Sequence, residues 1–139
     1  MAPSAEVRVA VARRGIESYA RGDIESTLAV MHPEIEGYAE GPNTGTFRGT
    51  DGFLGWTAEW MEAWERFDLD LSRVEAVGER HAVAIVDQTG LGRDSGVEVD
   101  QRVAYLFEID GEERCVHLAL YLDPERAFRA ARERESAPG

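Results

Sequence analysis

The feature that most constrains this chain is its second half, where four strand patterns follow one another from Leu69 to Leu122. The predicted strands cover residues 69–77, 82–89, 97–109 and 114–122. Glycine-rich segment 90–96 and the pair Asp110–Gly111 supply the tight turns that such strands need. Strands joined by short turns pair with their sequence neighbours, so we predict an antiparallel meander.

Helices are predicted to precede this meander, at residues 6–20, 24–31 and 53–67, with a short strand at 34–40 and a turn-rich loop at 41–52. The third helix carries an aromatic stripe with spacings of 3, 4, 4 and 3, formed by Phe53, Trp56, Trp60, Trp64 and Phe67. A last helix begins at Pro124, with Asp123 as its N-cap. Helices followed by a meander predict an α+β fold, in which a curved antiparallel sheet closed by helices forms a cone. The apolar interior of such a cone is a usual place for a small-molecule site.

Composition narrows the function classes. The 139 residues suit one domain over 1–139, with a core at about 6–131. A formal net charge of −12 disfavours nucleic-acid and anionic-membrane partners. All fifteen basic residues are arginine, which excludes a Schiff-base lysine, and the single Cys115 excludes an internal disulfide. No stretch approaches the roughly 18 apolar residues of a membrane span, so we expect a cytoplasmic protein.

Strand alternation assigns side chains to the two faces of the sheet. On the predicted strand 97–109, alternate residues share a face that we place inside: Val99, Gln101, Val103, Tyr105 and Phe107. On the last strand, Leu118 and Leu120 belong inside, whereas Cys115, His117 and Tyr121 belong outside. Gln101 and Tyr105 are the polar members of the inner set, and they are candidates to hydrogen-bond a ligand carbonyl.

Four stretches of the chain resemble the SnoaL-like branch of the NTF2-like superfamily: YARGDIESTLAVMHPEIE, TFRGTDGF, SGVEVDQRVAYLFEIDGEE and LYLDPERAFRAA. The resemblance runs from about Val9 to Ala131. It implies a cone-shaped α+β barrel with a deep pocket, often homodimeric through the outer sheet face. Relatives include polyketide cyclases, ketosteroid isomerases, limonene-type epoxide hydrolases and proteins without activity, so the resemblance leaves the chemistry open.

The catalytic groups of two relatives do not carry over. The tyrosine and two aspartates of ketosteroid isomerases correspond to Gly15, Ala39 and Tyr105 of this chain. The acid and the Arg-x-Asp pair of limonene-type epoxide hydrolases correspond to Leu120, Val86 and Gln88. The resemblance therefore implies a pocket that lacks the acids of these relatives.

Candidate catalytic residues are Glu40, Tyr105 and Gln101. Glu40 lies next to the isomerase base position, where it would act as an acid–base group while Tyr105 or Gln101 binds a developing enolate. Candidate substrate-binding residues are Tyr19, Tyr38, Trp56, Trp60, Gln88, Val103, Phe107, Leu118 and Leu120. Each of these residues also has an alternative without a function. Glu40 would be a solvated acid, the polar strand residues would be hydrogen-bonded within the fold, and the tryptophans would pack in the core. We read Asp87 as outward-facing and solvated or paired with arginine.

Two functions stay open, beside a third possibility: a dimeric fold unit whose cavity is filled, which the absence of a cavity would favour. The first is a SnoaL-like enzyme for cofactor-free acid–base cyclisation, isomerisation or hydration of a mostly apolar oxygenated substrate, polyketide- or terpenoid-like. The second is a non-catalytic protein that holds an apolar ligand in the same pocket. A carboxylate beside a phenol in the pocket would favour the enzyme, and an all-apolar pocket would favour binding. We expect no metal, because the three histidines lack ligand spacing, and no cofactor. We expect a homodimer through the outer sheet face, with His117 at or near the seam.

Overall fold

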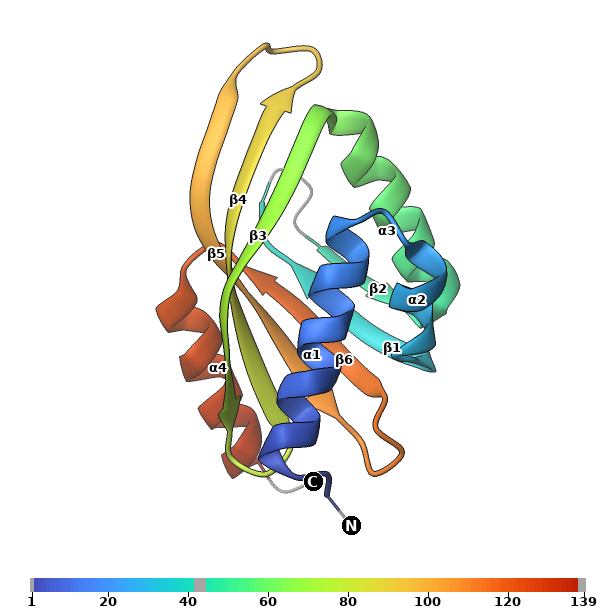
Figure 1. The fold of residues 1–139 in the computed structure, drawn as a ribbon, viewed down its shortest axis with the longest axis vertical. Coiled ribbons are helices and arrows are strands. Elements are labelled where there is room, and N and C mark those ends of the chain that lie inside the picture. Colours follow the sequence, from blue (N-terminus) through green and yellow to red (C-terminus); the bar gives the residue numbers. More distant parts are fainter. Residues whose placement is uncertain (1, 42–44, 138–139) are drawn as a thin grey trace.

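The computed structural model describes residues 2–41 and 45–137. Along the chain the elements are α1 (Ala5–Ala20), α2 (Ile24–Ala29), β1 (Met31–Ala39), β2 (Gly45–Arg48), α3 (Gly49–Ala63), β3 (Trp64–Val77), β4 (His81–Gly92), β5 (Glu98–Ile109), β6 (Cys115–Tyr121) and α4 (Pro124–Ser136). Figure 1 shows a twisted sheet with α1, α2 and α3 on one face and α4 on the other. The α+β prediction is confirmed.

The strands form one open sheet in the order β2-β1-β6-β5-β4-β3. Strands β3 to β6 pair antiparallel with their sequence neighbours, as the predicted meander requires. The expectation of a wholly antiparallel sheet is wrong at one place, because β1 pairs parallel with β6. A parallel pair needs a long crossover. Here the chain from β2 to β5 lies between these two strands in sequence.

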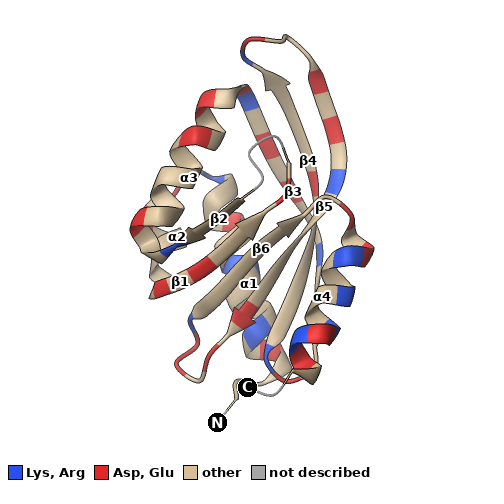
Figure 2. Cartoon of the chain, turned by 180° about the vertical axis from the view of Figure 1, so that it is seen from behind, with Lys and Arg blue, Asp and Glu red and all other residues tan. Residues whose placement is uncertain are grey.

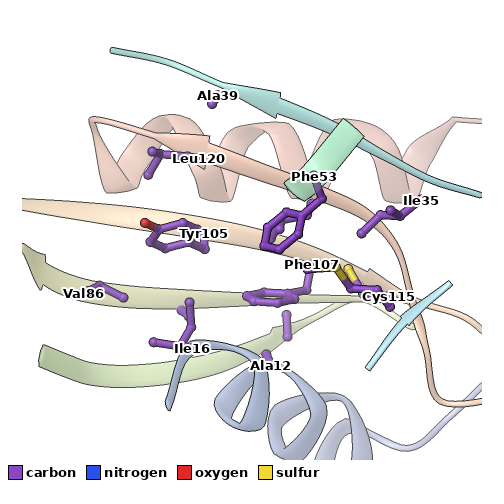
Figure 3. Packing of buried hydrophobic residues seen from close by; sticks show 14 of the residues in the cluster. Ala12, Ile16, Ile35, Ala39, Phe53, Val86, Tyr105, Phe107, Cys115 and Leu120 are labelled. Carbon is purple, nitrogen blue, oxygen red and sulfur yellow. The ribbon is translucent and has the colours of Figure 1, made fainter. Parts of the chain in front are cut away.

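Two apolar clusters hold the layers together. The larger lies between the sheet and helices α1 and α3, and Figure 3 shows Phe53 of α3 above Phe107 and beside Tyr105, both of β5, with Ile16 of α1 below. The smaller lies under α4, where small residues let helix and sheet approach closely: Ala104, Ala119, Ala127 and Ala131 with Val83 and Leu106. The inner placement of Val103, Tyr105 and Phe107 is confirmed.

The predicted third helix ends too late. Helix α3 stops at Ala63, and Trp64 and Phe67 belong to β3, where they pair with Gly92 and Gly90 of β4. A register shift between Trp64 and Arg66 allows both rings to face the interior. The aromatic stripe survives, since Trp60 lies 5.7 Å from Trp64 and 5.3 Å from Phe67 between ring centroids. The 3–4 spacing of the aromatic residues continues past the end of α3 by coincidence. Pairing of Trp64 with β4 sets the end of the helix.

The predicted loop 41–52 contains the edge strand β2 and the start of α3, while residues 42–44 lie outside the described residues. Within the described residues, strand β2 pairs with β1 alone, and there Phe47 lies opposite Gly37. The Phe47 ring occupies the space that a Cβ at residue 37 would need. The missing side chain of Gly37 thus leaves room for the Phe47 ring of the neighbouring strand. The turn-rich composition of residues 41–52 does not predict this contact.

Cys115 is the exception to the alternation on the last strand. It belongs to the inner cluster, whereas we expected it outside with His117. A register shift between β5 residues Glu108 and Ile109 reverses its side, because Glu108 pairs with His117 and Ile109 pairs with Cys115. Leu118 and Leu120 lie inside as expected.

Charged groups fasten the C-terminal end of α4 to the sheet. The Glu135 carboxylate accepts the backbone N–H groups of Glu79 and Arg80, each at 2.9 Å, and contacts Nδ1 of buried His81. On the other side of that ring, Glu108 lies 3.4 Å from His81 Nε2 and 2.8 Å from Arg134. The hydrogen bond from His81, together with Arg134, lowers the pKa of Glu108 to about 2.

Candidate functional site

A slender cavity of about 30 Å³ lies inside the larger apolar cluster. Its walls come from α1, α2, β1, β2, α3, β5 and β6: Gly15, Ile16, Tyr19, Thr27, Val30, Met31, Tyr38, Ala39, Phe47, Phe53, Trp56, Tyr105, Phe107, Cys115, Leu118 and Leu120. This volume holds a water molecule or two, not an organic ligand. A larger occupant therefore requires side chains to move apart.

The predicted site residues fall into two groups. Among those around the cavity are Tyr19, Tyr38, Trp56, Tyr105, Phe107, Leu118 and Leu120. Tyr38 only borders it, because its ring packs 5.7 Å from Tyr121 on the opposite face of the sheet. These residues lie together around the cavity, and their roles in binding or catalysis stay predictions.

Five predicted residues are not among the described residues that line the cavity: Glu40, Trp60, Gln88, Gln101 and Val103. Trp60 stacks on Trp56 at 5.5 Å, and Val103 is buried in the same cluster. Gln88 and Gln101 pair across β4 and β5, farther along the sheet. Gln88 is only 1% exposed, and neither amide atom has a hydrogen-bond partner in the described parts of the chain.

Glu40 does not face the cavity. It follows β1 on the outer side of the sheet, is 7% exposed, and shares Oε2 between the Tyr38 hydroxyl at 3.3 Å and Arg126 at 2.6 Å. Its Oε1 accepts the backbone N–H of Leu122 at 3.0 Å. Both oxygens are occupied, so this geometry favours a structural role, and the general-base role of Glu40 stays a prediction.

Two phenols supply polarity to the apolar lining. Tyr105 is buried, and no described residue forms a hydrogen bond with its hydroxyl. Burial raises its pKa far above the ordinary range, and the neighbouring Tyr19 phenol adds to this. Burial also raises the pKa of Tyr19, more than the nearby Thr57 hydroxyl lowers it. Both tyrosines are therefore neutral at physiological pH and available as hydrogen-bond donors.

The remaining polar lining groups have local partners. Thr27 hydrogen-bonds Ser18 at 2.8 Å, and the Cys115 thiol donates to the His117 carbonyl at 3.1 Å. Burial raises the pKa of Cys115 to about 12, so it is a thiol and not a thiolate nucleophile. No aspartate, glutamate or histidine occurs among the described lining residues. Asp87 accepts two hydrogen bonds from Arg102, at 2.9 and 3.0 Å. This is one of the two expected environments of Asp87, pairing with arginine.

The positions that carry the catalytic groups of ketosteroid isomerases do line the cavity here. By the resemblance, these positions are Gly15, Ala39 and Tyr105 of this chain.

 The three positions are thus occupied by a glycine, an alanine and a phenol, so the wall is in place without the base and acid of those enzymes. Leu120 likewise lines the cavity at a position where limonene-type epoxide hydrolases carry an acid.

Several lining residues were not predicted. Met31 and Phe47 lie in segments that we assigned to a helix end and a loop, so no strand alternation was available to orient them. Gly15 and Phe53 were noted in the sequence but not as cavity residues. A clustering of metal-ligating side chains is not found within residues 2–41 and 45–137. The expectation of no metal stays a prediction.

The fold and the apolar cavity with its two phenols define the class, a small α+β domain of the NTF2-like kind. A profile of the SnoaL-like domain matches residues 12–117, and the chain belongs to that family. No protein with curated annotation matches the sequence significantly. Within the described residues, no helix is long and apolar enough to cross a membrane.

Solved structures support the fold. An NTF2-like protein of unknown function from Burkholderia pseudomallei has a TM-score of 0.75 at 15% identity, with 88% of this chain and 95% of that chain covered. A putative SnoaL-like polyketide cyclase from Jannaschia sp. CCS1 has a TM-score of 0.75 at 16% identity, covering 99% and 98%. TerC, co-crystallised with polyporic acid, has a TM-score of 0.74 at 16% identity, covering 91% and 98%. At these identities the likeness shows the fold alone.

Proposed function

We propose that this chain binds a small, mostly apolar, oxygenated molecule in the cavity between its helices and its sheet. The observation that carries this proposal is the pair of neutral phenols, Tyr19 and Tyr105, in a lining that is otherwise almost wholly apolar. An apolar wall with a few convergent polar groups is the usual form of a small-molecule site. The phenols would donate hydrogen bonds to an oxygen of the ligand.

Binding requires the cavity to widen. Its present volume of about 30 Å³ is far below that of a typical ligand pocket. Phe47 lies on β2, a four-residue edge strand that pairs only with β1, so its ring is held by fewer strand partners than the walls on β5 and β6. We propose that Phe47 moves when a ligand enters.

A second candidate function is cofactor-free catalysis on a polyketide- or terpenoid-like substrate. It is favoured by the neighbouring phenols, because two preorganised donors can stabilise a developing enolate oxygen. Proton transfer also needs a base, and Glu40 would have to leave Leu122 and Arg126 to reach the cavity. The geometry therefore favours binding over proton transfer. A similar structure is named a putative SnoaL-like polyketide cyclase, which supports the catalytic candidate at the level of family only.

A ligand screen by thermal shift tests the binding proposal, since a ligand that binds only the folded state raises Tm. Compounds should be paired, each apolar ring system with and without a carbonyl or hydroxyl group. We expect the oxygenated member to bind more tightly, and Tyr105→Phe to weaken it about two- to tenfold, the usual net effect of one hydrogen bond. Tyr121→Phe, on the opposite face, is the matched control.

The same compounds separate the two candidate functions. Product formation followed by mass spectrometry, with a loss of about 10²-fold in Tyr105→Phe, would establish catalysis. Binding without product would support the binding protein. If no oxygenated apolar compound stabilises the chain, the proposed function is wrong.

A further inference from the structure

A second hollow lies on the other side of Tyr19 from the cavity. This groove, of about 360 Å³, runs between the turn that joins α1 to α2, helix α3 and strand β3. Tyr19, Gly22, Ile24, Thr57, Met61 and Leu69 are among its walls. Tyr19 lines both spaces, so this residue forms a partition between the small cavity and the larger groove.

The hydroxyl groups of Tyr19 and Thr57 are buried in this partition and lie near each other, but neither forms a hydrogen bond of normal length and angle within the described parts of the chain. Thr57 is 8% exposed and lies on α3. A threonine within a helix commonly bonds the carbonyl of the preceding turn, but the Thr57 hydroxyl does not. A buried polar group without a partner destabilises a fold, so the two hydroxyls call for an explanation, such as a bound molecule or water.

The rest of the groove is suited to an apolar body. Phe67 and Leu69 of β3 form its floor with Met61 of α3, whose side chain is 51% exposed. Methionine adapts its shape to irregular partners and is frequent at surfaces that bind many different partners. The groove thus has an apolar wall with the Tyr19 and Thr57 hydroxyls beside it.

We infer that this groove is a subsite for the same ligand and that it takes an elongated apolar molecule with a hydroxyl or carbonyl group. The ligand's body lies against Met61, Phe67 and Leu69, and its oxygen is bound by the hydroxyls of Tyr19 and Thr57. Its leading edge displaces the Tyr19 ring toward the small cavity. The inference rests on the proposed function, and it extends the ligand class from compact molecules to elongated ones.

Two methionines make the location measurable. Met31 lines the cavity and Met61 lines the groove, so ¹³C-methyl-methionine NMR reports each space separately. The probes are 2-naphthol and naphthalene, which differ only in the hydroxyl group. Aromatic probes shift nearby methyl resonances through their ring currents. Met31→Leu and Met61→Leu assign the two signals.

We expect the Met61 signal to move on titration with 2-naphthol and to saturate. Binding should be about three- to tenfold tighter for 2-naphthol than for naphthalene, as one or two net hydrogen bonds imply. Thr57→Val should abolish this preference without lowering Tm, because it removes an unpartnered buried hydroxyl. Thr57→Ser should retain the preference, and Thr89→Val, at an exposed threonine on β4, should leave it unchanged.

The outcomes separate the inference from the proposed function. Movement of Met31 alone would overturn the groove subsite and leave ligand binding in the cavity intact. A Met61 response with equal affinity for both probes, or unaffected by Thr57→Val, would overturn the assigned role of the hydroxyls. If neither methionine responds to either probe up to the solubility limit, both the subsite and the proposed pocket are wrong.

Discussion

The carboxylate of Glu40 holds together three parts of the chain that are far apart in sequence. It joins the end of β1 to the backbone of Leu122, just after β6, and to Arg126 on α4. Removing one partner of a buried hydrogen bond leaves the other unsatisfied, which destabilises a fold more than the bond itself stabilises it. Glu40 therefore belongs to the framework that carries the cavity.

We predict that Glu40→Ala lowers the free energy of unfolding by about 1–3 kcal/mol, because the Leu122 N–H loses its acceptor. Urea denaturation measures this, and Glu36→Ala, at an exposed glutamate on β1, should change stability by no more than about 0.5 kcal/mol. A Glu40→Ala protein with unchanged stability but lost turnover on an identified substrate would instead establish the general-base role.

His117 is a half-buried histidine on the outer side of the sheet. It lies beside Glu36 of β1 and Glu108 of β5, with Arg134 and His81 also acting on it. Burial lowers its pKa to about 4 from the usual 6.5. In the folded chain His117 therefore takes up its proton at a lower pH than an unperturbed histidine does.

We predict that stability falls as pH decreases from about 6.5 toward 4, because the unfolded chain takes up the His117 proton before the folded chain does. Urea midpoints at pH 7.5 and 5 should differ in the wild type, and His117→Gln should reduce the difference. His32→Gln should not, since its ring lies in an exposed contact with the Glu34 N–H. Glu108 acts in a lower window, below about 4.5, because its folded pKa is about 2.

At the scale of elements, the β1–β2 pair builds one wall of the cavity from a short edge strand. Phe47 packs against Phe53 at 5.8 Å and Trp56 at 6.0 Å, and Gly37 leaves the space that its ring fills. The wall therefore depends on one glycine. Any side chain at residue 37 must displace the Phe47 ring.

We predict that Gly37→Ala lowers stability by about 1–3 kcal/mol, the usual effect of overpacking. It should also change ligand affinity, because Phe47 leaves the cavity wall. Gly45→Ala, on β2 itself, is the matched control, since nothing lies within 4 Å of its added Cβ. Thermal unfolding and ligand titration of both variants test this, and equal effects of the two changes would contradict it.

At the scale of the molecule, α4 covers only part of the outer sheet face. Figure 2 shows α4 over one side of the sheet, while the outer surface of β1 and β6 is open to view, with acidic residues on β1. Tyr38 and Tyr121 pack together on this face, and Leu122 beside them is 39% exposed. Glu36 also lies there, paired with Arg48 at 2.7 Å. A partly apolar face with paired charges suits a symmetric interface.

We propose a homodimer through this face and predict a mass near twice 15.4 kDa by light scattering at micromolar concentration. Tyr121→Glu should shift the mass to that of one chain, since it places a charge at the centre of the interface. Val97→Glu, at an exposed position before β5, should leave the dimer intact. A single-chain mass for the unmodified protein would refute the dimer.

The ends of several helices and the faces of the strands follow from interactions between residues that are close in sequence. The caps Asp23 and Asp123, the helix end near Gly22 and the helix start at Pro124 could be predicted because each depends on residues a few positions apart. The same holds for the alternation of Val103, Tyr105 and Phe107. The order of helices and strands, and the inward phenol of Tyr105, followed from these signals.

Tertiary structure alone decided the rest, because those features depend on which distant segments pair. The parallel β1–β6 pairing, the short strand β2 and the transfer of Trp64 from helix to strand arise only when the sheet assembles. A single register shift placed Cys115 inside, and Arg126 on α4 drew Glu40 away from the cavity. The packing of side chains from six or more elements set the cavity volume and left Tyr19 and Thr57 without partners, which no local pattern encodes.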